Sequence, residues 1–289
     1  MQRDPLESAS ETAALITLLR GGAGQLVGFA NRLEEVGSAR MLLEREANLL
    51  TPQLLADAVI DITRWSSRGI RALTLLDADY PENLRAVHDR PPLLFVLGAL
   101  ERRDARSVAV IGSRRASPTG LERARAIAAS LVTAGYTIFS GLAAGIDTAA
   151  HVAALGGRGR TVAVLGTGLE RAYPPQNEAL QQRIAASAAV VSQFWPEAGP
   201  TRRSFPQRNA LMSGLTLATV VVEAGPTSGA RTQIRAALRH GRPVLLARSL
   251  LEQPWAREVA TRPGVEVIAS FDELTDAMQR ISCSDPLIA

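Results

Sequence analysis

The sequence contains no lysine: all 32 of its basic residues are arginine, against 28 acidic residues. This absence excludes a P-loop phosphate-binding lysine, a Schiff-base lysine and a lysine general base. A bound phosphate would have to be held by arginine forks, backbone N–H groups or helix N-termini. A genome-wide preference for arginine would produce the same composition, but the chemical exclusion holds in either case.

Cysteine and histidine are also scarce. The single cysteine, Cys283, can form neither an intramolecular disulfide nor a cysteine zinc cage. The three histidines, His88, His151 and His240, are scattered along the chain. The sequence therefore predicts no metal site and no cofactor.

Long hydrophobic runs are missing as well. No apolar stretch approaches the roughly 20 residues that a membrane-spanning helix needs, and the beginning, MQRDPLESASET, has no apolar signal-peptide core. A hydrophobic fraction of 46% is still enough to form a buried core. We therefore expect a cytoplasmic protein with no membrane partner.

The pattern along the chain predicts three parts. Residues 1–68 contain short helical segments separated by glycine, the last opening with Thr51 as N-cap and Pro52 in the first turn. Residues 69–104 form a connecting segment. In residues 105–289, apolar runs such as RSVAVIG and LATVVVEA alternate with helix-length segments. This alternation predicts an α/β fold with a doubly wound, mostly parallel, Rossmann-like sheet, preceded by a small helical domain.

Ligands of such sheets bind beyond the carboxyl ends of the strands, so the loops that follow the strands are the candidate site. Most of these loops are rich in glycine, serine or threonine, and several contain arginine, which suits a phosphate-bearing ligand. The predicted loops are 112–120, 140–147, 166–177, 194–215 and 223–233.

The fourth loop contains Arg202, Arg203 and Arg208 with Phe205 among them. Guanidinium groups with an interposed aromatic ring are typical of single-stranded nucleic-acid binding, where arginine contacts phosphate and the ring stacks on a base. A solvated basic loop with Phe205 packed inward is the equal alternative.

Three residues are candidates for acid–base chemistry. Asp147 and His151 lie four residues apart in a predicted helix and so can share a face, although Asp147 also suits a helix first turn and His151 a core position. Glu223 ends a predicted strand, where it can bind a ribose hydroxyl, act as an acid or base, or brace the loop. A dinucleotide site is poorly supported, because Gly166 and Gly168 are followed by Arg171 where the third glycine belongs.

Six sequence blocks occur in order at compatible spacing between about residues 70 and 247: YPENLRAVHDRPPLLFVLG, VAVIGSRRAS, SGLAAGIDTAAH, TVAVLGTGLERAYPPQN, FPQRNALMSGL and VVVEAGPTSGARTQIRAALRHGRPV. Together they resemble the Smf/DprA family of DNA-processing proteins. The resemblance implies a non-enzymatic protein that binds and protects single-stranded DNA in a basic pocket, forms a homodimer and assists loading of a RecA-type recombinase in transformation or recombination. It also implies that the N-terminal helices form a SAM-like domain.

The family motifs and the loop composition together assign a set of candidate DNA- or phosphate-binding residues. They are Gly112, Ser113, Arg114, Ser140, Gly141, Gly145, Gly166, Arg202, Arg203, Phe205, Arg208, Asn209, Ser228 and Gly229.

The chain also departs from the family pattern. Ala210 stands where a second basic residue is usual, Gln193 replaces a glutamate, Arg231 replaces an apolar residue, and the sequence ends at Ala289 without a winged-helix domain. The alternative function is a nucleotide sensor or a nucleoside-monophosphate phosphoribohydrolase using Asp147, His151 and Glu223. Such hydrolases carry a PGGxGTxxE motif, whereas this chain has AGPTSGARTQ.

Overall fold

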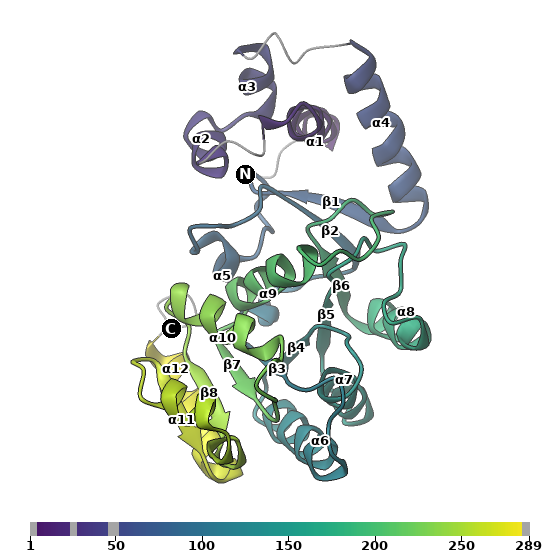
Figure 1. The fold of residues 1–289 in the computed structure, drawn as a ribbon. Helices are drawn as coiled ribbons and strands as arrows, with labels where there is room; N and C mark the ends of the chain where they lie inside the picture. Colours follow the sequence, from purple (N-terminus) through teal and green to yellow (C-terminus); the bar gives the residue numbers. More distant parts are fainter. Residues whose placement is uncertain (1–4, 24–27, 46–51, 285–289) are drawn as a thin grey trace.

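A computed structural model describes residues 5–23, 28–45 and 52–284. The described chain forms a sheet of nine strands covered by helices on both faces (Figure 1). The strands are β1 (Ile70–Thr74), β2 (Leu93–Gly98), β3 (Ser107–Ile111), β4 (Thr137–Ser140), β5 (Thr161–Val164), β6 (Ala189–Ser192), β7 (Ala218–Val221), β8 (Val244–Ala247) and β9 (Val265–Ile268). The α-helices are α1 (Pro5–Arg20), α2 (Phe29–Val36), α3 (Ala39–Arg45), α4 (Pro52–Ser67), α5 (Glu82–Arg85), α6 (Pro118–Thr133), α7 (Ile146–Gly156), α8 (Glu178–Ser187), α9 (Ser204–Leu215), α10 (Ala230–Arg239), α11 (Pro254–Ala260) and α12 (Phe271–Ser284). Within these ranges, no helix is long and apolar enough to cross a membrane.

The strand order confirms the predicted doubly wound sheet. The order is β1-β2-β6-β5-β4-β3-β7-β8-β9, and the seven strands from β3 to β9 run parallel. The chain winds outward from β3 in one direction through β4, β5 and β6, and then in the other through β7, β8 and β9. The order therefore reverses between β3 and β7, and their carboxyl ends open the crevice in which ligands of this fold bind.

Side chains of the central strands alternate between two cores. In β3, Val108 and Val110 face a cluster formed with α6, α7 and α12, whereas Ala109 and Ile111 face the larger cluster that includes α8, α9, α10 and the N-terminal helices. Because successive strand residues point to opposite faces, a strand buried on both sides has to be apolar throughout. This explains the continuous hydrophobic runs in the sequence.

The N-terminal helices lie beyond the β1 edge of the sheet (Figure 1). Trp65 of α4 packs edge-on against Phe95 of β2, with ring centroids 5.0 Å apart, and stacks on Trp195 at 6.1 Å. The predicted helical segments are present together with α3, which was not predicted; Thr51, the predicted N-cap, lies outside the described residues. The expected connecting segment supplies β1 and β2, which pair antiparallel with each other, and β2 pairs antiparallel with β6.

The prediction of a loop over residues 194–215 was wrong for its second half, which forms helix α9 (Ser204–Leu215). Pro206 is compatible with this helix because it lies in the first turn, where a proline's missing N–H is not needed for an intrahelical hydrogen bond. This helix brings Arg208 and Asn209 to the crevice on a rigid element rather than on a loop.

A buried ion pair joins the beginnings of the strands. Arg160 donates from Nε to Asp104 Oδ1 at 2.6 Å and from Nη2 to Oδ2 at 2.8 Å, and both side chains are less than a tenth exposed. Asp104 belongs to a short 3₁₀ helix (Arg102–Ala105) that precedes β3, and its Oδ1 also accepts from the Thr137 hydroxyl of β4 at 3.2 Å. The carboxylate thus ties three neighbouring segments together.

Replacing this carboxylate (Asp104→Ala) would remove the acceptor of Arg160 Nε and the carboxylate acceptor of Nη2, and would leave the buried guanidinium with Glu101 as its remaining carboxylate partner among the described residues. We expect the free energy of unfolding, measured by urea denaturation, to fall by about 3–5 kcal/mol. The matched control is Glu266→Ala, because Glu266 pairs with Arg280 on the surface, where removing a partner changes stability by about 0–1 kcal/mol. Equal losses for the two variants would contradict this role of Asp104.

Candidate nucleic-acid interface

A pocket of about 390 Å³ opens at the carboxyl ends of β3 and β7, where the strand order reverses. Its walls come from the loop after β3, the loop after β7 and the facing sides of α9 and α10. Eight of the predicted binding residues line it: Gly112, Ser113, Arg114, Phe205, Arg208, Asn209, Ser228 and Gly229.

A second pocket of about 90 Å³ adjoins the first and contains Gly141 and Gly166. Arg114, Ala143, Phe205 and Arg208 line both pockets. The two pockets are therefore neighbouring parts of one depression, which we call the arginine groove. Residues from four loops that are distant in sequence meet in it.

Arg208 is the most deeply placed cation of the groove, with only 6% of its surface exposed. Its Nη1 donates to the carbonyl of Val164 at 3.1 Å, and its Nε donates to Oδ1 of Asn209 at 3.0 Å. A Cβ atom at Gly141 would lie 1.5 Å from Nη1. The glycine therefore provides the space that the guanidinium occupies.

The charges around Arg208 favour an anion in the groove. Burial lowers the pKa of Arg208, attraction to Asp147 opposes this effect, and repulsion from Arg114 reinforces it. A negative group between Arg114 and Arg208 would relieve that repulsion and replace the water that burial removes. Arg115 adds a third guanidinium to the lining.

Aromatic rings lie directly beside these cations. The guanidinium carbon of Arg114 lies 5.0 Å from the centroid of the Phe205 ring, within the range of a cation–π contact. The Tyr173 ring is 5.6 Å from Phe205, and Tyr173 is 38% exposed. The groove thus combines positive charge with aromatic surface that a ligand can reach.

Asp147 lines the groove, but its carboxylate is hydrogen-bonded to backbone N–H groups of the loop before α7. Its Oδ2 accepts from the N–H groups of Gly141 at 3.1 Å and Ala143 at 3.4 Å. Burial raises the pKa of Asp147, and attraction to Arg208 together with these backbone hydrogen bonds opposes the increase. The carboxylate therefore shapes the 141–143 loop and balances the charge of Arg208.

His151 is fully buried on α7 and lines neither part of the groove. Its Nδ1 lies 2.7 Å from the Thr161 hydroxyl, which itself donates to the carbonyl of Ile138, so Nδ1–H donates to the hydroxyl oxygen. Burial lowers the pKa of His151 from 6.5 to about 3. The residue is therefore a neutral part of the core at neutral pH.

Glu223 braces the loop between β3 and α6. Its Oε1 accepts from the Ser117 backbone N–H at 2.9 Å, and its Oε2 accepts from the Ser117 hydroxyl at 2.5 Å. Its own carbonyl accepts from Ser113 N–H at 2.7 Å. The fold therefore does not bring Asp147, His151 and Glu223 together as an acid–base set.

Four other predicted residues lie outside the lining of the groove. Ser140 is buried, and its hydroxyl donates to the Val110 carbonyl at 2.6 Å. Gly145 has a φ of 81°, a left-handed conformation that favours glycine, and a Cβ there would lie 2.3 Å from the carbonyl oxygen of Ser113. Arg202 and Arg203 are exposed immediately before α9.

The structure also adds lining residues that the sequence reasoning missed. They include Arg115, Tyr173, Thr227 and Gln233. Gln233 is only 1% exposed, and no partner for its Oε1 occurs among the described residues. Its position about one helical turn after Gly229 was the available signal, since residues three or four apart share a helix face.

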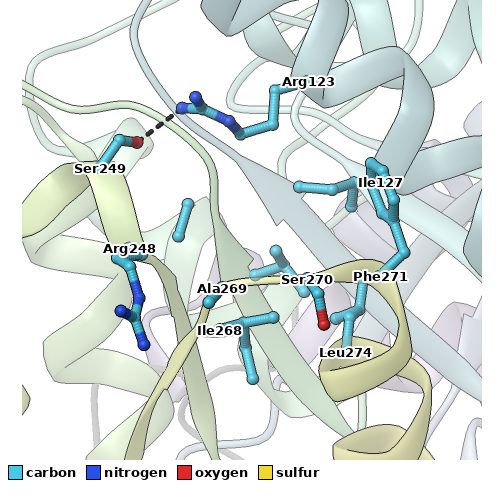
Figure 2. A pocket seen from close by; sticks show the side chains of 11 residues that line it. Arg123, Ile127, Arg248, Ser249, Ile268, Ala269, Ser270, Phe271 and Leu274 are labelled. Carbon is cyan, nitrogen blue, oxygen red and sulfur yellow. Dashed lines mark hydrogen bonds between the residues drawn. The ribbon is translucent and has the colours of Figure 1, made fainter.

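A separate pocket of about 270 Å³ lies between α6, α12 and the ends of β8 and β9 (Figure 2). Arg123 points across it and donates from Nη1 to the Ser249 hydroxyl at 2.6 Å (Figure 2). The other side chains drawn there are mostly apolar, including Ile127, Ile268 and Leu274. This pocket has fewer cations than the arginine groove, so the groove is the stronger candidate for an anionic ligand.

An open doubly wound sheet with a basic groove at its switch point defines a Rossmann-like protein suited to a phosphate-bearing ligand. The family model described as DNA recombination-mediator protein A matches residues 71–277. The chain belongs to this family, which confirms the resemblance drawn from the six sequence blocks.

Two curated relatives give the extent of the similarity. Protein Smf of Synechocystis sp. is 39% identical over 271 residues, which cover 91% of this chain and 64% of the relative. The DNA processing protein DprA of Streptococcus pneumoniae is 40% identical over 173 residues, covering 60% of this chain and 61% of the relative. The chain therefore spans less than two thirds of the length of either relative.

Two solved structures share the fold. The X-ray structure of DNA processing protein A from Streptococcus pneumoniae aligns with a TM-score of 0.72 at 29% identity, covering 96% of this chain and 98% of that one. The Helicobacter pylori DNA processing protein A, for which a single-stranded DNA binding mode is described, aligns with a TM-score of 0.64 at 24% identity, covering 73% and 96%. The second similarity establishes the fold only.

Adding a methyl group at Gly141 (Gly141→Ala) should force Arg208 out of its position. We expect the free energy of unfolding in urea to fall by about 1–3 kcal/mol, as for other overpacked sites. Gly199→Ala is the control, because a Cβ at this exposed glycine meets nothing within 4 Å, and its effect should stay within about 0.5 kcal/mol. A Gly141→Ala variant as stable as the control would contradict the close packing of Arg208.

The buried His151 predicts a specific pH dependence of stability. Its pKa is 6.5 when exposed and about 3 in the folded protein, so the unfolded chain binds more protons between these values. The contribution of the neutral, buried His151 to the free energy of unfolding is therefore complete above about pH 6.5. As the pH falls below this value, the free energy of unfolding decreases by at most about 1.4 kcal/mol per pH unit, because the unfolded chain gains a proton that the folded protein does not bind. Urea denaturation between pH 7 and pH 5 should show a shallower loss for His151→Gln than for the wild type. Identical slopes would contradict the burial of a neutral imidazole.

Proposed function

We propose that this protein binds single-stranded DNA in the arginine groove. The observation that carries the proposal is the placement of Arg114 and Arg208 on one groove, with the Phe205 ring of the Arg208 helix packed against the Arg114 guanidinium. Two guanidinium groups near each other favour a ligand with repeated negative charge, and an aromatic face favours unpaired bases. Membership of the recombination-mediator family supports the same ligand.

The groove offers a separate contact for each part of a nucleotide strand. Arg114, Arg115 and Arg208 are suited to backbone phosphates, and the beginning of α10 at Gly229 adds a helix N-terminus, which also favours anions. The exposed ring of Tyr173 and the partly buried ring of Phe205 beside it are suited to stacking on bases. We also assign Arg202 and Arg203 a peripheral role, because their exposed charges immediately precede α9, the helix that carries Arg208.

We infer that the protein acts by binding rather than by catalysis. Asp147 is bonded to backbone N–H groups, His151 is in the core and Glu223 is bonded to Ser117, so the groove offers no convergent acid and base. Binding of a mononucleotide or release of a base remain outcomes that an experiment can distinguish. Formation of a homodimer and loading of a RecA-type recombinase stay predictions drawn from the family, and a cytoplasmic location stays a prediction drawn from the sequence pattern.

The proposal is tested by fluorescence anisotropy with a labelled oligothymidylate across a salt series. We expect affinity to fall as salt increases, and Arg114→Ala to weaken binding by about tenfold or more. If Arg114 contacts a phosphate, its removal should also reduce the log–log salt slope by about 0.7. Arg208→Ala should weaken binding further, with circular dichroism used to check that the buried substitution leaves the protein folded.

The matched control is Arg262→Ala, which removes the same charge from an exposed position outside the groove. Equal losses of DNA affinity for Arg114→Ala and Arg262→Ala would indicate general electrostatic attraction and would contradict the proposed site. Unlabelled duplex DNA and thymidine monophosphate serve as competitors. Competition by the mononucleotide as strong as by the single strand would favour a nucleotide sensor, and release of free base would favour an enzyme.

A further inference from the structure

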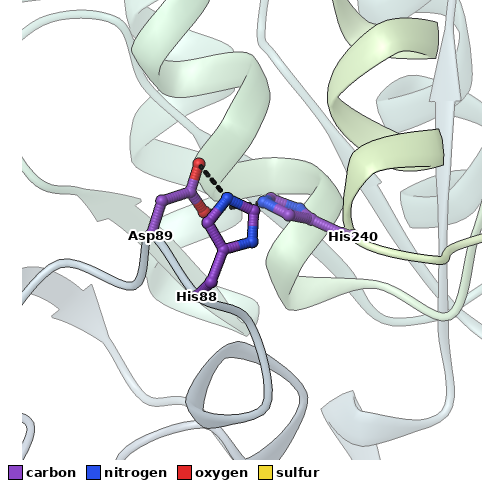
Figure 3. A group of neighbouring side chains, drawn as sticks. All are labelled: His88, Asp89 and His240. Carbon is purple, nitrogen blue, oxygen red and sulfur yellow. Dashed lines mark hydrogen bonds and ion pairs between the residues drawn. The ribbon is translucent and has the colours of Figure 1, made fainter. Parts of the chain in front are cut away.

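The fold brings two of the three histidines together at a place remote from the arginine groove. His88 and Asp89 lie in the turn after α5, whereas His240 is the C-cap residue that follows α10 (Figure 3). One ligand atom from each of the three residues lies within 4.8 Å of the other two. Asp89 and His240 are 151 residues apart in sequence, which is why the histidines looked scattered.

The contacts of His240 fix which ring nitrogen faces the carboxylate. The Ser213 hydroxyl donates to the carbonyl of Ala210 at 2.9 Å, so its oxygen accepts from Nδ1–H of His240 at 2.8 Å. Nε2 then lies 2.6 Å from Oδ1 of Asp89. In the neutral ring this nitrogen presents a lone pair to a carboxylate oxygen, and at 2.6 Å the two atoms have room for a proton between them. Zinc, with bonds of about 2.0–2.2 Å to each atom, would hold them roughly 3.3 Å apart, so metal binding requires a small outward shift of the Asp89 carboxylate, whose side chain is 36% exposed.

A hydrogen-bonded second nitrogen is also the usual arrangement behind a metal-binding histidine, where it sets the ring orientation and the tautomer. The His240 side chain is fully buried, so its orientation is held by packing as well as by Ser213. His88 is 65% exposed, and its Nε2 lies 4.0 Å from Oδ2 of Asp89. Rotation of this exposed side chain can bring its nitrogen to the same point.

We infer that His88, Asp89 and His240 form a binding site for a divalent first-row transition metal of the zinc type. Two imidazoles and one carboxylate are a donor set that zinc accepts, with a fourth position left for water. Magnesium and calcium prefer oxygen donors, and the set offers only one carboxylate among its three groups. We therefore expect the site to bind zinc in preference to magnesium and calcium.

A metal at this position would connect the 88–89 turn to the end of α10 and, through Ser213, to α9. Helix α9 contributes Arg208 and Asn209 to the arginine groove, and Gly229, the N-cap of α10, also lines it. The metal would thus act as a structural clamp between the segment before β2 and the two helices that form one wall of the groove. The clamp does not depend on what the groove binds.

The test uses the full chain without a histidine tag, treated with a chelator and then freed of it by dialysis. Isothermal titration with zinc chloride should show one site, and the melting temperature should rise with zinc but not with magnesium. Titration with cobalt should produce visible absorption bands of a nitrogen- and oxygen-ligated ion. His88→Ala should weaken zinc binding at least tenfold, and because His88 is exposed this variant keeps the His240–Asp89 contact and the fold.

Asp89→Asn provides a second variant, which keeps the shape but removes the negative charge, and it should also lose affinity and the cobalt spectrum. Cys283→Ser is the matched control, because the exposed Cys283 is the one thiol that could bind zinc adventitiously. Zinc binding that is unchanged in His88→Ala, lost in Cys283→Ser, or absent from the wild type would overturn the proposal; absence would mean that a proton alone joins His240 to Asp89.

Discussion

The buried guanidinium of Arg208 is the constraint on which the candidate site depends. A cation that is 6% exposed is costly unless its hydrogen bonds and its charge are satisfied. The Val164 carbonyl and the Asn209 side chain satisfy hydrogen bonds, and Asp147 supplies the opposing charge. Asp147 is in turn held by the backbone of the 141–143 loop, and Gly141 leaves room for the guanidinium. Loop shape, helix position and groove charge are therefore coupled.

Two other carboxylates have comparable organising roles. Asp104 pairs with Arg160 and joins the beginnings of neighbouring strands, and Glu223 fixes the loop that carries Arg114 by accepting both polar hydrogens of Ser117. Each carboxylate is used for structure, which leaves positive charge in excess on the groove. Cations that outnumber the carboxylates on a rigid support are expected of a phosphate-binding surface, and here Arg114, Arg115 and Arg208 share the lining with Asp147.

Periodicity was sufficient to predict the seven strands from β3 to β9. Strands β3 to β8 are buried along their whole length and therefore have to be continuously apolar, whereas the edge strand β9 is only partly buried and carries the exposed Glu266. The same reasoning failed for α9, where Pro206 and several polar residues hid a helix whose side chains are fixed mainly by tertiary packing. Eight predicted residues lie on the main pocket, whereas Tyr173 has no local signal and Gln233 has only its position one helical turn after Gly229. Contacts of those two residues depend on loops that are remote in sequence.

The sequence by itself determined the class of fold, the family and the exclusion of lysine chemistry, because these follow from local patterning, ordered motifs and composition. Only the tertiary structure decided which arginines share a groove, that Asp147, His151 and Glu223 are bonded to separate parts of the scaffold, and that His240 meets His88 and Asp89. The physical reason is that charge interactions and metal coordination act over a few ångströms in space. Residues that are far apart in sequence become neighbours only in the folded sheet, so their positions in the sequence do not predict these contacts.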